Sequence, residues 1–113
     1  MVTRYVPDAG DLIWLTFDPQ AGREQAGRRP ALVLTPRRYN AASGLAICCP
    51  ITSRVKGYPF EVATGNNAAI AGVVLADHVK SLDWKARKAT LAGQVSPEAL
   101  ADVRARLKPL LGT

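Results

Sequence analysis

Three polar segments hold most of the residue types that could do chemistry in this chain. Residues 23–30 place Arg, Glu and Gln ahead of Arg29, residues 52–57 begin with Thr52, and residues 37–40 carry two arginines. Each segment follows or interrupts an apolar run, so short strands with loops at their ends can gather the three at one edge of a sheet. Solvated surface loops have the same composition. The segments by themselves are consistent with either a site or a plain surface.

The chemistry open to such a site is narrow. His78 is the single histidine, and the sequence has no zinc-type spacing, phosphate-binding glycine motif or serine elbow. Cys48 and Cys49 are adjacent in an apolar run, so on a strand they point to opposite faces and are poorly placed to pair or to share a metal. We interpret them as small core residues and expect no metal and no cofactor. Arginine, hydroxyl and carboxylate groups remain.

A site that cleaves RNA can be built from those groups, because RNA supplies its own nucleophile, the ribose 2′-hydroxyl. Such a site needs a base for that hydroxyl, an acid for the leaving 5′-oxygen, and donors for the charge on the phosphorane. The guanidinium of Arg29 matches phosphate geometry, Thr52 can donate a hydrogen bond, and Glu24 is the nearest candidate base. Glu24 has a structural alternative, which is an ion pair with Arg23 or Arg28.

The overall charge points to an anionic partner. The net charge is +6 and the sequence pI is about 9.8, which fits nucleic acid, an acidic peptide or a membrane surface, with nucleic acid somewhat favoured. The first residues lack the apolar core of a secretion signal, and no segment is long enough to span a bilayer. We therefore expect a cytoplasmic protein with no membrane partner.

The length of 113 residues predicts a single domain over residues 1–113, and short apolar runs between turn residues predict that it is rich in strands. In the first strand the even-numbered side chains from 12 to 16 share one face, and the odd-numbered ones from 13 to 17 share the other. A polar loop over 19–29 follows it, and a short turn or single helical turn is expected over 37–41. The expected strands comprise residues 11–18, 30–35, 45–51, 58–63, 73–75 and 88–93.

The pattern changes near the C-terminus. Residues 96–98 combine a capping hydroxyl, a first-turn proline and an acid, in the order that a helix start prefers. Apolar residues follow at helical spacing, namely Leu100, Val103 and Leu107. Pro109 is expected to end this helix, since the residue before a proline avoids helical angles. The fold class is therefore mainly β or α+β: a strongly bent antiparallel sheet or small barrel with a C-terminal helix.

Several runs of the sequence resemble the MazF family, which includes the Kid and PemK toxins. The most specific are Glu-Gln-Ala-Gly at 24–27, leading into Arg29 and Pro30, and Lys-Gly-Tyr-Pro-Phe at 56–60. The resemblance spans nearly the whole chain, including the terminal helix. Further similar runs are residues 4–8, 10–14, 61–62, 75–77 and 79–81.

This resemblance implies a fold, an activity and partners. Members are toxins of type II toxin–antitoxin systems on an SH3-like barrel related to the gyrase poison CcdB. They act as homodimers and as sequence-specific, metal-independent mRNA interferases that cut single-stranded RNA to 2′,3′-cyclic phosphate and 5′-hydroxyl ends. By similarity Arg29 takes the main catalytic position and Thr52 the second, with Glu24 assisting. The implied inhibitor is a MazE-like antitoxin with an acidic, partly disordered tail, and the positive charge of this chain suits both that tail and RNA.

Residues for RNA contact follow in part from the resemblance. Where similar members have histidine before the catalytic arginine, this chain has Arg28, which we expect to bind phosphate. Phe17 and Gln25 are candidates for base contacts, although a strand aromatic such as Phe17 more often packs inward. His78 replaces a glutamine and is interpreted first as a lining or core residue, with a catalytic role as the alternative. The candidates for contact with the RNA backbone are Arg54, Lys56 and Lys80.

Other assignments stay open. Trp14 and Trp84 are expected in the core or in dimer contacts. A non-enzymatic, CcdB-like toxin that binds gyrase and a basic nucleic-acid-binding barrel without turnover are the two alternative functions. A carboxylate and a guanidinium near a hydroxyl argue against a pure binding module, and Arg29→Ala separates catalysis from binding.

Overall fold

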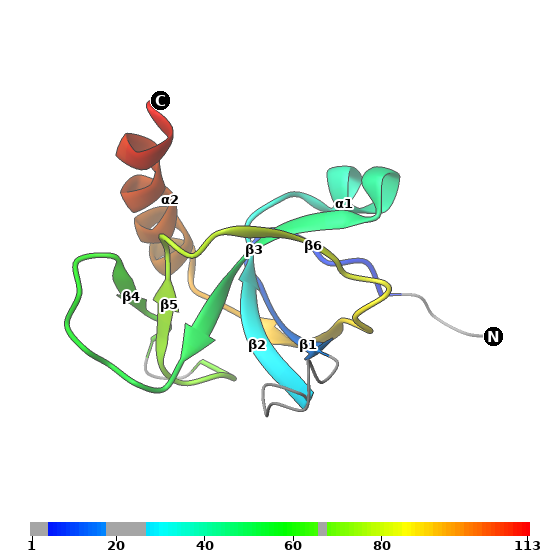
Figure 1. The fold of residues 1–113 in the computed structure, drawn as a ribbon, viewed down its shortest axis with the longest axis horizontal. Helices are drawn as coiled ribbons and strands as arrows, with labels where there is room; N and C mark the ends of the chain where they lie inside the picture. Colours follow the sequence, from blue (N-terminus) through cyan, green and yellow to red (C-terminus); the bar gives the residue numbers. More distant parts are fainter. Residues whose placement is uncertain (1–4, 18–26, 66–67) are drawn as a thin grey trace, which may run out of the picture.

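The computed structural model describes residues 5–17, 27–65 and 68–113. In this part of the chain a curved antiparallel sheet carries two helices (Figure 1). The strands run in the order β4-β5-β3-β2-β1-β7, and β6 also pairs with β3. Their bounds are β1 Asp11–Phe17, β2 Gly27–Val33, β3 Leu45–Thr52, β4 Glu61–Ala63, β5 Val73–Leu75, β6 Lys80–Asp83 and β7 Thr90–Gln94, with α1 at Arg37–Ser43 and α2 at Pro97–Leu111. The predicted fold class is confirmed.

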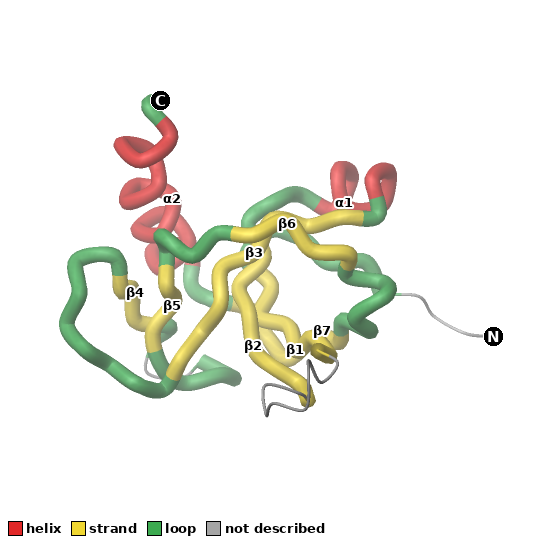
Figure 2. The backbone as a smooth tube through the Cα atoms, viewed as in Figure 1, coloured by secondary structure: helices red, strands yellow, loops and turns green. Residues whose placement is uncertain are grey.

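The sheet curls, and its two faces bury different apolar clusters. Strands β7, β1, β2, β3 and β6 form a barrel-like wall, and residues 84–89 lead from β6 back to β7 (Figure 2). Leu12 and Leu32 pack on one face with Val103 and Leu107 of α2. The cluster on the other face contains Ile13, Leu15, Ala31, Val33, Ala46, Cys48 and Trp84. The alternation predicted for the first strand is therefore confirmed.

The two tryptophans have different environments. Trp84 is buried, and its indole nitrogen donates to the Asn40 carbonyl oxygen at 2.9 Å. Trp14 is 36% exposed and lies on the other face from Ile13 and Leu15. The core assignment is confirmed for Trp84 only.

Strands β5 and β6 pair with consecutive parts of β3, and the register changes between them. Ile51 lies opposite Val74, and Cys48 lies opposite Lys80. Three positions separate the two β3 residues, whereas six separate their partners, so three extra residues stand between β5 and β6. This inserted segment includes His78, whose amide donates to the Leu75 carbonyl oxygen at 3.0 Å.

The terminal helix begins as predicted but ends later. Its first turn is capped by the Ser96 hydroxyl, which accepts from the Ala99 amide at 3.1 Å. The expectation that Pro109 ends the helix is wrong, because α2 continues to Leu111. A proline this near the end removes one backbone donor, and Gly112, in the left-handed conformation, caps the last turn onto the carbonyls of Lys108 and Pro109.

Other boundaries differ where tertiary pairing extends or shortens an element. β2 begins at Gly27, so part of the predicted 19–29 loop is strand, because Gly27, Arg28 and Arg29 pair with β1. The predicted 58–63 strand contracts to β4, and α1 is longer than the single turn expected. β6 was not predicted, because its mostly exposed, polar residues lack an apolar alternation. No helix in the described ranges is long and apolar enough to cross a membrane.

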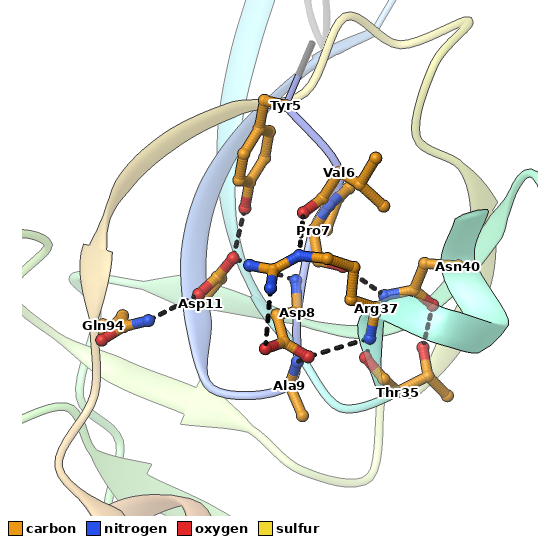
Figure 3. Close-up of polar contacts among 10 residues, drawn as sticks. All are labelled: Tyr5, Val6, Pro7, Asp8, Ala9, Asp11, Thr35, Arg37, Asn40 and Gln94. Carbon is orange, nitrogen blue, oxygen red and sulfur yellow. Dashed lines mark hydrogen bonds and ion pairs between the residues drawn. The ribbon is translucent and has the colours of Figure 1, made fainter. Parts of the chain in front are cut away.

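A buried polar cluster holds the N-terminal segment to the barrel (Figure 3). The Asp11 carboxylate is 1% exposed and accepts from the Tyr5 hydroxyl at 2.5 Å, the Asp8 amide at 3.0 Å and the Gln94 side chain at 3.0 Å. Burial, together with this hydrogen bond to Asp11, raises the pKa of the Tyr5 phenol. The buried Asn40 amide donates to carbonyl oxygens at 2.8 and 2.9 Å. The cluster joins β1, β7 and α1 to the N-terminal segment and so stabilises the fold.

Candidate functional site

The site lies where β2 and β3 separate. Their pairing ends with Ala31 opposite Pro50, after which the other edge of β3 pairs with β5 (Figure 1). Pro30 and Pro50 stand at this point, and neither has a backbone N–H to continue a ladder. Arg29 and Thr52 each lie two positions from the last pair, on the same face as that pair. The divergence of β2 and β3 therefore has the Arg29 guanidinium on one side and the Thr52 hydroxyl on the other.

Beside this divergence is a cavity of about 670 Å³. Its floor is apolar, with Leu15, Ala31 and Cys48 buried, and its wall includes three cationic residues. The residues that line it are Leu15, Phe17, Arg29, Pro30, Ala31, Cys48, Pro50, Lys80, Leu82 and Arg87. An apolar floor below cations suits a ligand with flat apolar rings and negative charge.

Arg29 and Lys80 reach this cavity from different strands. Arg29 pairs with Leu15 of β1, and Lys80 pairs with Cys48 of β3. Both side chains are exposed. The planar guanidinium of Arg29 carries paired donors whose geometry matches a phosphate.

Thr52 lies on a second, smaller cavity of about 170 Å³. The lining residues are Thr52, Arg54, Lys56, Tyr58, Glu61, Leu75 and His78. The Glu61 carboxylate accepts from the Gly57 amide at 2.9 Å and from the Lys56 amide at 3.1 and 3.2 Å, which fixes the polar loop after β3. His78 is exposed on this wall, so the lining interpretation fits and the core interpretation does not.

The backbone at Thr52 is fixed from two sides. Thr52 pairs with Val73 of β5, and the Thr52 hydroxyl accepts from the Arg54 amide at 3.1 Å. Gly72 approaches so closely that a Cβ there would lie 2.3 Å from the Thr52 carbonyl oxygen. Because the hydroxyl accepts from Arg54, its own hydrogen stays available to donate.

The Arg28 side chain lies on the opposite face of β2 from the Arg29 side chain. Neighbouring residues on a strand face opposite sides, and the Arg28 guanidinium donates to the Trp14 carbonyl oxygen at 3.0 Å, the Lys88 carbonyl oxygen at 3.0 Å and the Thr90 hydroxyl at 2.7 Å. It also donates to the Thr16 hydroxyl. The structure therefore places Arg28 in a protein contact and away from the predicted phosphate site.

The remaining predicted residues divide among the two cavities and the undescribed segment. Lys80 and the half-buried Phe17 line the larger cavity, and Arg54 and Lys56 line the smaller one. Glu24 and Gln25 lie outside the described residues.

Sequence reasoning missed Arg87. Its guanidinium carbon lies 4.4 Å from the centre of the Phe17 ring, and it reaches the cavity from the turn after β6. No motif marks this position, and only the closure of the barrel brings the turn to the cavity.

Possible metal ligands and cysteine thiols are arranged as follows in the described part of the chain. In the described ranges no cluster of three or more His, Cys, Asp or Glu side chains could hold a metal ion. Cys48 and Cys49 are both buried and unpaired with each other. Burial raises the pKa of each thiol to about 12, so both stay protonated at neutral pH. Their interpretation as small core residues is confirmed.

Comparison with known proteins identifies the class. Residues 8–111 match the family model of the PemK-like, MazF-like toxins of type II toxin–antitoxin systems, and the chain belongs to this family. It is 54% identical over 112 residues to the endoribonuclease toxin MazF of Escherichia coli strain K12, covering 99% of this chain and 100% of that protein.

Solved structures agree with this assignment. MazF in a MazE–MazF crystal structure from Deinococcus radiodurans is 56% identical, with a TM-score of 0.93 over 97% of this chain and 99% of that one. An endoribonuclease from a mycobacterial species is 21% identical and has a TM-score of 0.75 over 96% of this chain and 93% of its own, which shows a shared fold.

Proposed function

We propose that this endoribonuclease toxin cleaves single-stranded RNA with the scissile phosphate bound between Arg29 and Thr52. The observation that carries the proposal is the separation of β2 from β3, which presents a guanidinium and a hydroxyl on one face at the edges of two cavities. The nucleotides on either side of the phosphate would occupy those cavities. The strand has to be single, because bases must leave a stack to enter them.

The chemistry follows from what RNA supplies. The 2′-oxygen attacks phosphorus, the bond from phosphorus to the 5′-oxygen breaks, and the products are a 2′,3′-cyclic phosphate and a 5′-hydroxyl. Arg29 can bind two phosphoryl oxygens and Thr52 can donate to one, so both stabilise the phosphorane. One proton leaves the 2′-hydroxyl and another reaches the 5′-oxygen. Glu24 remains the sequence-based candidate for the base, and no metal or cofactor takes part.

The walls of the cavities provide binding groups of the kind that single-stranded RNA needs. Phe17 and Tyr58 offer aromatic faces, while Lys80, Arg54 and Lys56 supply positive charge. Gln25 remains a sequence-based candidate for a base contact. Stacking and backbone attraction together hold a flexible strand.

The partners follow from the relatives. The Deinococcus structures contain MazE with MazF, and we infer a MazE-like acidic antitoxin for this chain. Its net charge of +6 attracts an acidic peptide as it attracts RNA. We further infer a homodimer that acts in the cytoplasm.

The test is cleavage of a long single-stranded RNA by the purified protein in excess EDTA, with mapping of the fragment ends. Discrete cuts with 5′-hydroxyl ends are expected, and Arg29→Ala should slow them by about 100-fold or more. Arg38→Ala is the matched control. It removes the same charge at an exposed position of α1, and Arg38 lines neither cavity. Thr52→Val keeps the shape and removes the donor, so it should also lower kcat.

Two results would overturn the proposal. Equal cleavage by Arg29→Ala and Arg38→Ala would remove Arg29 from catalysis. Intact RNA from a folded dimer across varied substrates would favour a gyrase-binding toxin or a binding barrel without turnover.

A further inference from the structure

The turn between β6 and β7 is held rigidly beside the larger cavity. The Ala89 amide donates to the Trp84 carbonyl oxygen at 2.9 Å, and the Thr16 amide donates to the Arg87 carbonyl oxygen at 2.7 Å. Lys88 has a φ of 54°, a conformation that a residue other than glycine keeps only when its surroundings impose it. The turn is therefore a fixed part of the wall.

Arg87 projects from this turn into the wall of the cavity that contains Arg29 and Lys80. Its guanidinium carbon lies 4.4 Å from the centre of the Phe17 ring, and one of its nitrogens donates to the Thr16 carbonyl oxygen at 3.4 Å. A guanidinium stacked on an aromatic ring keeps its edge donors free, and these fit a phosphate. Arg87 is thus oriented before any ligand arrives.

The position of Arg87 differs from that of Arg29 along β1. Arg29 lies opposite Leu15, whereas Arg87 lies over Phe17, two residues further along the same face. Two strand residues span about 6.6 Å. Arg29 and Arg87 therefore reach the cavity from positions about two residues apart along β1, which allows them to contact different phosphates of one strand.

Arg28 fixes this turn from the opposite side of β2. Its guanidinium donates to the Lys88 carbonyl oxygen at 3.0 Å, next to Arg87 in the chain, and to the Thr90 hydroxyl at 2.7 Å. The same group binds the Trp14 carbonyl oxygen at 3.0 Å. One side chain thus connects β1 and the start of β7 to the turn that carries Arg87.

We propose that Arg87 binds the RNA phosphate next to the scissile one, and that Arg28 is a positioning residue for Arg87. This inference rests on the proposed function, since it requires RNA in the larger cavity. Arg28 touches no RNA in this arrangement. It acts by keeping the turn, and with it the Arg87 guanidinium, in place.

The first test measures binding of a short single-stranded RNA that carries a 2′-deoxy substitution at the cleavage position, over a range of salt concentrations. Arg87→Ala should weaken binding about 10-fold, and the slope of log affinity against log salt should fall by about 0.7, the value for one lost phosphate contact on a single strand. With cleavable RNA, KM should rise about 10-fold while kcat stays within about 2-fold. Arg38→Ala, which removes the same charge at α1, should change none of these quantities.

The second test measures the dependence of Arg87 on Arg28. Arg28→Ala should weaken RNA binding in the wild-type background and have little effect in the Arg87→Ala background. Thr90→Val removes one partner of Arg28 without changing charge, and it should give a smaller loss of the same kind. Urea unfolding of each variant identifies the folded ones, and Thr90→Val keeps the test decisive if Arg28→Ala does not fold.

The outcomes separate the two proposals. If the wild type cuts RNA and Arg87→Ala has the same affinity and salt slope, the role of Arg87 is wrong while the proposed function stands. If the losses from Arg28→Ala or Thr90→Val are equal in both backgrounds, Arg28 does not position Arg87. A wild-type protein that neither binds nor cuts RNA overturns the proposed function and this inference together.

Discussion

The contact of Gly72 with Thr52 predicts that a single added methyl group disturbs the candidate active site. In Gly72→Ala the new Cβ would lie 2.3 Å from the carbonyl oxygen of Thr52 and 3.0 Å from its carbonyl carbon. Ordinary van der Waals contact begins at 3.4 Å, so the two backbones have to separate by about 1 Å. Gly72 also has a φ of 135°, which side-chain-bearing residues rarely adopt.

These effects have separate magnitudes. The backbone conformation costs about 1–3 kcal/mol, and the collision adds about 1–3 kcal/mol of overpacking. A displacement of about 1 Å at a catalytic group lowers the rate by about 100-fold. Gly72→Ala should therefore lower kcat because Thr52 is displaced. It should also lower the free energy of unfolding, because of the backbone conformation at residue 72 and the steric collision.

Gly65→Ala is the matched control. Its φ is 112°, and a Cβ there meets no described heavy atom within 4 Å, so it carries the backbone cost without the collision. The assay is kcat on a short RNA with a fluorophore and quencher, together with urea unfolding of both variants. If folded Gly72→Ala and Gly65→Ala lose the same kcat, the contact with Thr52 has no role in catalysis and the reasoning is refuted.

Three further predictions concern stability and reactivity. Leu107→Ala removes a buried side chain between α2 and the sheet and should cost about 2–5 kcal/mol of unfolding free energy in urea; a loss below 1 kcal/mol would show that α2 packs loosely there. The Arg37 amide, which donates to Asp8, holds the pKa of that carboxyl below its usual 3.8. Asp8 therefore contributes stability that is present above about pH 4 and is lost as pH falls through the lowered pKa. Asp8→Asn should reduce the loss of stability between pH 5 and pH 3, and an unchanged pH dependence would exclude this contribution. Because burial raises the pKa of the Cys48 and Cys49 thiols to about 12, a thiol reagent at pH 8 should react with them only after unfolding, and rapid labelling of the native protein would contradict their burial.

Much of the architecture could be predicted from local patterns. The alternation in β1 follows from side chains that bury one of two faces, and it matches the two apolar clusters. The start of α2 follows from its cap, because the Ser96 hydroxyl satisfies an amide that the helix cannot. Arg29, Thr52 and Lys80 could be named as candidates because guanidinium, hydroxyl and ammonium groups suit a phosphate, and the family resemblance marks the positions of Arg29 and Thr52.

Other features depend on residues that are distant in the sequence. β6 forms because β3 offers an unpaired edge, so its polar residues carry no local signal. Pro109 does not end α2 as predicted, because the loss of one backbone donor in the final turn is offset by the Gly112 cap. Arg28 and Arg29 are neighbours in the sequence, yet the pairing of β2 with β1 extends the strand through both and sends them to opposite faces.

The sequence by itself determined the chemical groups, the strand and helix periodicities and the family, because these depend on residue types and short spacings. Only the tertiary structure decided which groups meet. Arg87 reaches the Arg29 cavity because the curled sheet brings the β6–β7 turn against Phe17. Arg28 makes hydrogen bonds within the protein, because the acceptors of its guanidinium lie on β1, on β7 and in that turn. Such contacts arise from the closure of the barrel, which short-range patterns do not encode.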